Sequence, residues 1–139
     1  MRSLLLATAL VATPVSAATD QFDLVCRGQQ KLSANGRPTP KETRYRIDLA
    51  RKSWCTDQCK EVRPIQDVSQ GQIVIEAHER TNSEDFTVRH TIDRTTGAWT
   101  NFYSSAGVRT RMMFSPGAWW ETNGNCEAAE FSGFPAPRF

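Results

Sequence analysis

Residues 43–49 read Thr43-Arg44-Tyr45-Arg46-Ile47-Asp48-Leu49, a regular alternation of polar and apolar side chains. Successive side chains of an extended strand point to opposite faces, so this period predicts Tyr45, Ile47 and Leu49 on a buried face. Their polar neighbours, Asp48 among them, are predicted to face solvent. The stretch therefore predicts a half-buried β-strand and not a helix.

The same alternation recurs on both sides of this stretch, while no window shows a sustained helical period. Further strands are predicted at 22–26, 54–55, 72–79, 86–93, 98–103 and 108–114. Residues 118–121 are ambiguous, and 127–131 fit either a last strand or a helical turn. Turn signals such as Asn35-Gly36 and Arg94-Thr95-Thr96-Gly97 separate the strands, and Gly97 is expected to supply a positive φ. Roughly seven or eight short strands predict an all-β antiparallel meander, curved into a small barrel or sandwich.

The first 17 residues have the three parts of a secretory signal peptide. Arg2 supplies a positive start, an uncharged apolar run follows over 4–12, and Val15-Ser16-Ala17 supplies small residues before the cleavage point. The apolar run is shorter than the roughly 20 residues of a membrane-spanning helix. We therefore expect cleavage after Ala17, one mature β-rich domain over 18–139, no membrane span, and a periplasmic or secreted location.

Four cysteines, an even number, lie in the predicted mature chain. In a small exported domain such a count predicts two disulfides, and four cysteines allow three pairings. Proximity favours Cys55–Cys59 as a local bridge, which leaves Cys26–Cys126 as a long-range one. A four-thiolate zinc site is the alternative, but the pair Cys55 and Cys59 has no close-spaced counterpart.

Charge and motif content narrow the classes of function. The chain has 17 Lys and Arg against 15 Asp and Glu, which gives no overall attraction to nucleic acid or anionic membranes. Its eight glycines are dispersed among turns and form no phosphate-binding loop, and no GxSxG motif is present. The sequence thus predicts no cofactor and no assigned catalytic residue.

The two histidines, His78 and His90, are a second set of residues that suggests a metal site. They lie twelve positions apart on successive predicted strands, with Glu76 and Glu79 nearby, so they meet across a hairpin if the register allows it. A small metal-dependent hydrolase built on His78 and His90 is therefore one alternative function. Structural or solvated histidines are the other interpretation.

Aromatic residues concentrate in the last third of the chain. Adjacent strand residues such as Trp119 and Trp120 point to opposite faces, so one can fill the core while the other is exposed. Exposed aromatic side chains often mark binding surfaces. Coverage by the C-terminal tail is the alternative. The predicted binding surface consists of Trp99, Phe102, Tyr103, Trp119 and Trp120.

Five short segments together resemble a group of small, uncharacterised exported proteins of alphaproteobacteria. The segments are FDLVCRG at 22–28, YRIDL at 45–49, WC at 54–55 with Cys59, IDRTTG at 92–97 and GNC at 124–126. The resemblance implies a periplasmic setting and no known activity, ligand or catalytic residue. In size, compartment and strand content the chain is also similar to small lipocalin-like and lysozyme-inhibitor barrels.

These observations predict a non-enzymatic periplasmic or secreted module that binds a ligand or a protein partner. The partner is expected to be a protein or a small apolar molecule. An inhibitor of an envelope-directed enzyme such as lysozyme is a special case of this prediction.

Overall fold

The computed structural model describes residues 19–79, 86–105 and 118–136. All regular structure in these ranges is β-strand, which confirms the all-β class. The predicted signal peptide and the strand predicted over 108–114 lie outside the described residues. The strands of the described part are β1 (Gln21–Lys31), β2 (Thr39–Asp48), β3 (Ser53–Thr56), β4 (Arg63–Pro64), β5 (Asp67–Val68), β6 (Gln72–Glu79), β7 (Phe86–Asp93), β8 (Ala98–Ser105) and β9 (Trp119–Ala129).

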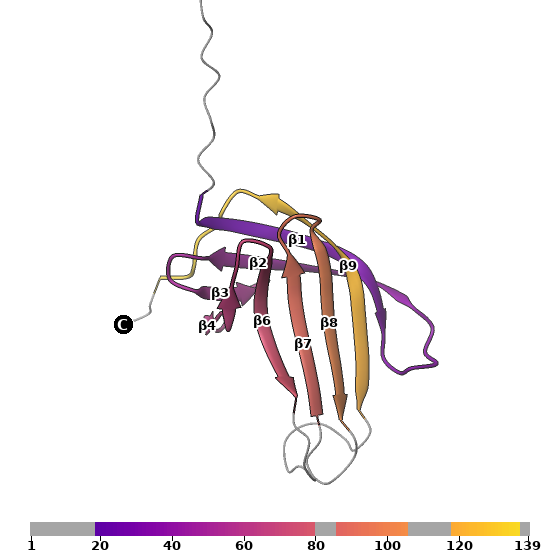
Figure 1. Ribbon diagram of the computed structural model, residues 1–139. Helices are drawn as coiled ribbons and strands as arrows, with labels where there is room; N and C mark the ends of the chain where they lie inside the picture. Colours follow the sequence, from indigo (N-terminus) through magenta and orange to yellow (C-terminus); the bar gives the residue numbers. More distant parts are fainter. Residues whose placement is uncertain (1–18, 80–85, 106–117, 137–139) are drawn as a thin grey trace, which may run out of the picture.

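These strands form one antiparallel sheet in the order β4-β3-β2-β1-β9-β8-β7-β6-β5. Apart from β4 and β5, strands that follow one another in the chain are paired, and the first and last strands pair in the middle of the sheet. The two edges of the sheet are β4 and β5, which have two residues each and do not pair with one another. The sheet curls into a half-barrel, in which β1 to β3 run across the direction of β6 to β8 (Figure 1).

The pairing of β1 with β9 carries the long-range disulfide. Cys26 faces Cys126 in the antiparallel register, with 3.9 Å between the Cα atoms, and the two are bonded. Cys55 and Cys59 form the second disulfide, and no cysteine is left free. Both predicted pairings are therefore confirmed.

Two glycines face each other two positions along the same ladder. Gly28 is the register partner of Gly124. A Cβ on Gly28 would collide with the carbonyl oxygen of Asn123, and one on Gly124 would collide with the carbonyl oxygen of Arg27. Since β1 and β9 are long strands that bend together (Figure 1), glycine at both positions lets their backbones approach through the bend.

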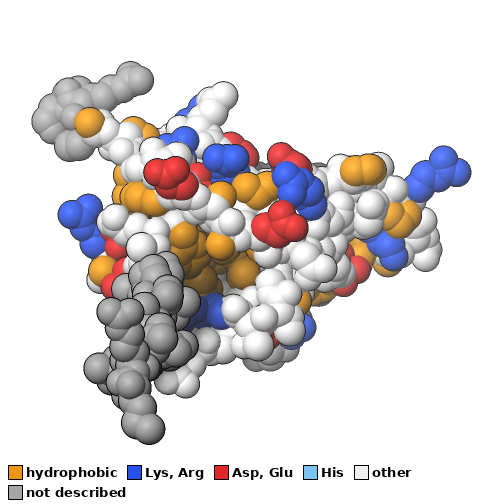
Figure 2. Space-filling view, turned by 90° about the horizontal axis from the view of Figure 1, so that it is seen from above, with side chains coloured by type: hydrophobic (Ala, Val, Ile, Leu, Met, Phe, Trp, Pro, Cys, Tyr) orange, Lys and Arg blue, Asp and Glu red, His pale blue; other side chains and the backbone are white. Residues whose placement is uncertain are grey.

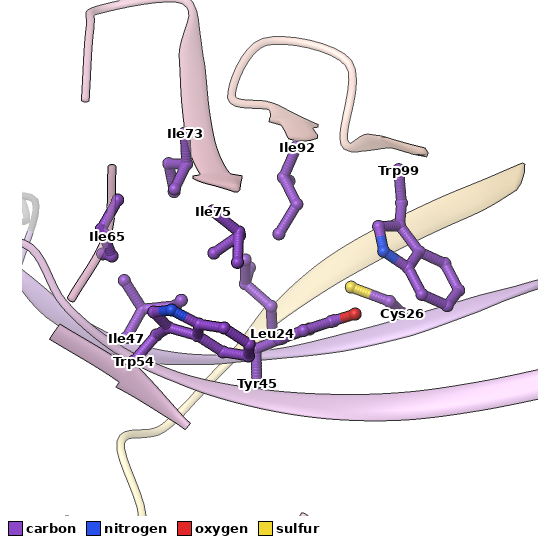
Figure 3. Close-up of a cluster of buried hydrophobic side chains, with 10 residues drawn as sticks. All are labelled: Leu24, Cys26, Tyr45, Ile47, Trp54, Ile65, Ile73, Ile75, Ile92 and Trp99. Atoms are coloured by element: carbon purple, nitrogen blue, oxygen red, sulfur yellow. The ribbon is translucent and has the colours of Figure 1, made fainter. Parts of the chain in front are cut away.

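The hydrophobic core lies inside the curl, where side chains of β1 to β3 meet those of β6 to β8 (Figure 3). Tyr45 and Ile47 are almost completely buried there, as their alternation predicts, and Leu49 packs against the core while half-buried. The buried core residues are Leu24, Cys26, Tyr45, Ile47, Trp54, Ile65, Ile73, Ile75, Ile92 and Trp99.

The prediction that Asp48 faces solvent is wrong, because its side chain is completely buried. Its carboxylate accepts hydrogen bonds from Nε2 of Gln21 at 2.7 Å and from the backbone N–H of Arg51 at 2.9 Å. The chain turns directly after β2, so the backbone of the turn folds over the carboxylate. Asp48 alternates correctly onto the outer face, but that face is covered at this point.

The C-terminal segment covers another part of the outer face of β1 and β2. Asp23, also completely buried, accepts hydrogen bonds from the backbone N–H and hydroxyl of Ser132 at 3.2 and 2.7 Å. Arg46 donates through Nη1 to the carbonyl oxygen of Gly133 at 2.7 Å. These contacts attach the segment to the sheet.

The last strand is longer than the sequence indicates. Residues 118–121 are ambiguous in the sequence, and 127–131 fit two alternatives, yet β9 runs without interruption from Trp119 to Ala129. Its pairing with β8 on one side and β1 on the other fixes it as extended. Within the described residues, no helix has the length and apolar character needed to cross a membrane.

Candidate functional site

A pocket opens at one end of the half-barrel, where β1 and the end of β9 lie over the adjacent ends of β6, β7 and β8. We call it the mouth pocket. Its volume is about 570 Å³. The view from above shows a hollow with hydrophobic side chains in it (Figure 2). The apolar part of the lining is Phe22, Leu24, Ile73, Ile92, Cys126 and Ala128, and the polar part is Thr19, Asp93, Arg94, Thr95 and Thr96, with Gly97.

Two cross-strand pairs build the apolar floor of the mouth pocket. Leu24 of β1 faces Ala128 of β9, and Ile73 of β6 faces Ile92 of β7. Leu24, Ile73 and Ile92 belong to the core and point toward one another from opposite walls (Figure 3). The pocket is therefore a recess in the open end of the core, with Ala128 at its exposed side.

The turn between β7 and β8 forms the polar rim. One carboxylate oxygen of Asp93 accepts the backbone N–H groups of Thr95 at 2.8 Å and Thr96 at 2.7 Å. The N–H of Thr96, then its side chain and the N–H of Thr95, lower the pKa of Asp93, so this residue is ionised at neutral pH. Gly97 has a φ of 75°, which confirms the positive φ predicted for this position.

The rim is tied to the strands around it. Gly97 accepts a hydrogen bond from the backbone N–H of Cys126 at 2.8 Å, which links the turn to β9. Arg94 donates its backbone N–H to the carbonyl oxygen of Gly71 at 2.9 Å, which links the turn to the start of β6. Fixed partners on both sides give the pocket a preformed edge.

A second pocket, of about 490 Å³, lies beside the Cys55–Cys59 loop. Its lining is mainly polar and charged, and Arg63 pairs with Glu61 in it at 2.7 Å. Asp57 and Cys59 adopt left-handed backbone conformations, with φ of 47° and 52°. Ligand sites are typically lined by hydrophobic side chains with a few polar groups, a description that fits the mouth pocket better.

The structure divides the predicted aromatic surface. Trp99 lies in the core, with 2% of its surface exposed, and is therefore not part of a surface. Tyr103 and Trp120 are register partners whose rings stack at 4.1 Å, while the rings of Phe102 and Trp119 meet edge to face at 5.9 Å. Since neighbouring strand residues point to opposite faces, the two half-buried pairs lie on opposite faces of the sheet.

The register also separates the two histidines. His78 lies opposite Val88 and is exposed beside Glu76, with 3.7 Å between Nε2 and Oε1. His90 is buried, and its Nε2 lies 2.9 Å from the hydroxyl of Tyr45. Among the described residues, no group of three His, Cys, Asp or Glu side chains could hold a metal ion.

His90 sits among aromatic rings in the core. The rings of Tyr45 and Trp54 lie 5.3 and 5.7 Å from the imidazole, both edge to face. Burial lowers the pKa of His90 to about 4 and raises the pKa of Tyr45 well above its usual value. Both groups are neutral at neutral pH, and their hydrogen bond satisfies each of them inside the core.

Sequence reasoning did not identify the mouth pocket. It predicted a strand over 86–93 and a turn over 94–97, but it did not combine them with Leu24 and Ile73. The floor brings together strands separated by most of the chain, and only the register places these side chains in one recess. The turn motif directly after Ile92 was the one local signal.

The fold and the pockets are established by the geometry of this chain alone. Comparison with family models, with curated proteins and with solved structures finds no match to this chain.

Proposed function

We propose that this domain binds a small, mainly apolar molecule in the mouth pocket. The observation that carries the proposal is the recess itself, which is lined by core side chains of opposite walls. Its volume of about 570 Å³ falls in the range of roughly 300–1,000 Å³ typical of small-molecule sites. An apolar floor with a polar rim on one side is the usual composition of such sites.

The distribution of apolar surface favours a small ligand over a flat protein partner. Leu32 and Val62 are the large hydrophobic residues that are exposed in the described ranges, and they lie in two different loops. Protein-binding patches are usually contiguous apolar areas at the surface. Leu32 and Val62 do not form such an area together, so an inhibitor of an envelope-directed enzyme is the less supported alternative.

We also propose that the domain works in an oxidising compartment outside the cytoplasm. Two disulfides and the absence of a free cysteine support this location, because cytosolic thiols are kept reduced. The leader-like pattern of the first 17 residues supports export. Mass spectrometry of the protein isolated from its host is expected to give a chain that begins at Ala18, whereas an intact N-terminus would contradict export.

Binding is tested with N-phenylnaphthylamine, a neutral apolar dye that becomes fluorescent in apolar sites. The purified protein is expected to bind it saturably. Ala128→Trp places a large side chain at the exposed side of the pocket without removing a core residue, and it is expected to abolish binding.

Glu127→Trp is the matched control. Glu127 is the neighbouring residue on β9, its side chain is 83% exposed, and its alternation directs it to the opposite face. This variant is expected to bind the dye as the original protein does. A linear, unsaturable response, or equal binding by both tryptophan variants, would contradict the proposal.

A further inference from the structure

Arg94 holds a fixed position on the rim of the mouth pocket. Its backbone N–H is bonded to the carbonyl oxygen of Gly71, and Nη1 donates to the carbonyl oxygen of Ser69 at 2.8 Å. Both acceptors belong to the turn between β5 and β6. Because two bonds attach the residue to one turn, its side chain has less freedom than that of an unattached surface arginine.

Among the described residues, most of the N–H donors of this guanidinium have no acceptor. A guanidinium has five N–H donors, and the bond to Ser69 uses one of them. Within the described ranges, no carboxylate lies in ion-pair distance of Arg94. Arg27 shows the contrast on the outer face, where its Nε lies 2.6 Å from the carboxylate of Glu42.

Asp93, the acidic neighbour on the rim, has a different role. Its Oδ1 already accepts two backbone N–H groups of the turn, from Thr95 and Thr96. The turn donors therefore satisfy this oxygen locally, while in the described part of the chain the positive charge of Arg94 has no carboxylate partner. The N–H donors of Arg94 that remain are suited to an anion.

We infer that the mouth pocket selects an apolar molecule with a carboxylate at one end, which Arg94 binds while the chain lies against Leu24, Ile73 and Ile92. This inference rests on the proposed function, since it names the class of ligand for the same pocket. Arg94 suits the role because a guanidinium can offer two parallel N–H groups to one carboxylate.

The test compares decanoate with decanol, which share a chain and differ in the charged end. Each displaces N-phenylnaphthylamine from the purified protein at neutral pH and low salt. Decanoate is expected to bind about three- to ten-fold more tightly than decanol, a difference that shrinks at high salt because the pair is partly exposed. Arg94→Gln is expected to remove this difference.

Arg89→Gln is the control, because it removes the same charge from an exposed position on β7 outside the pocket. It is expected to keep the preference for decanoate. Equal affinities of the original protein for the two ligands, or an unchanged preference in Arg94→Gln, would overturn the inference while leaving the pocket as a binding site. Failure of both ligands and the dye to bind would instead overturn the proposed function.

Discussion

The hydroxyl of Tyr45 and Nε2 of His90 lie 2.9 Å apart in the core and join two strands that are distant in the sheet. Tyr45 belongs to β2 in one wall of the half-barrel, and His90 belongs to β7 in the other. A buried polar group without a partner costs about 1–3 kcal/mol. The bond therefore satisfies both groups and fixes how the two walls meet.

The buried His90 makes the stability of the fold depend on pH. Its pKa is about 4 in the folded protein and 6.5 as the ordinary value, so the unfolded chain binds more protons between these two values. The free energy of unfolding is expected to fall as pH drops below 6.5, by about 2 kcal/mol between about pH 7 and pH 5. Urea denaturation at several pH values measures this fall.

His90→Gln is the control for that experiment, because an amide can still hydrogen-bond to Tyr45 but does not titrate. This variant is expected to be less stable at neutral pH and to have a flatter pH dependence over the same interval. An equal slope in both proteins would show that other groups cause the effect.

The two disulfides are expected to contribute unequally to stability. Cys26 and Cys126 are separated by 100 positions, and Cys55 and Cys59 by four. In the chain-entropy view, loops of these lengths correspond to about 4.7 and about 2 kcal/mol. Urea denaturation of the double alanine variants compares them, and a larger loss on removing the short bridge would be inconsistent with this account.

The facing glycines of β1 and β9 are expected to tolerate no side chain. Gly28→Ala or Gly124→Ala would force a Cβ against a carbonyl oxygen of the opposite strand, so each is expected to lower the free energy of unfolding by about 2 kcal/mol or more. Gly71→Ala is the matched control, since no atom lies within 4 Å of a Cβ there. Thermal unfolding measures all three, and a loss in Gly71→Ala as large as in the other two would contradict the explanation.

Asp23 is expected to hold the C-terminal segment on the sheet. Asp23→Asn weakens the bonds to Ser132 and the 3.4 Å ion pair with Arg44, so faster amide exchange is expected at Ser132 and Gly133. The expected loss of stability is about 1–3 kcal/mol. Glu42→Gln removes a carboxylate that is exposed on the same face and is expected to change neither quantity. Unchanged exchange at Ser132 in Asp23→Asn would refute this role.

Local rules predicted the parts of the fold that depend on one strand at a time. Tyr45 and Ile47 are buried, as the alternation of side chains along β2 requires. The disulfide pairing followed from the short separation of Cys55 and Cys59 in the sequence. The prediction that Asp48 is exposed was wrong because the burial of an outer-face residue depends on which part of the chain folds over that face. The alternation of side chains along a strand shows to which face a residue points, but it does not show whether another segment covers that face.

The candidate site depends on register, which the sequence does not specify for distant strands. The pairing of Ile73 with Ile92 spans one hairpin, whereas Leu24 meets Ala128 only because β1 and β9 close the sheet. Trp99 was assigned to a surface because the aromatic cluster was considered by composition alone. Its position opposite Gly124 in the ladder directs it into the core.

Amide chemical-shift mapping during a titration with decanol tests the central claim, that the open end of the half-barrel is a ligand site. The account predicts saturable shifts concentrated at Leu24, Ile73, Ile92 and the turn over 93–97. Shifts confined to the Cys55–Cys59 loop, or the absence of any saturable shift, would contradict it.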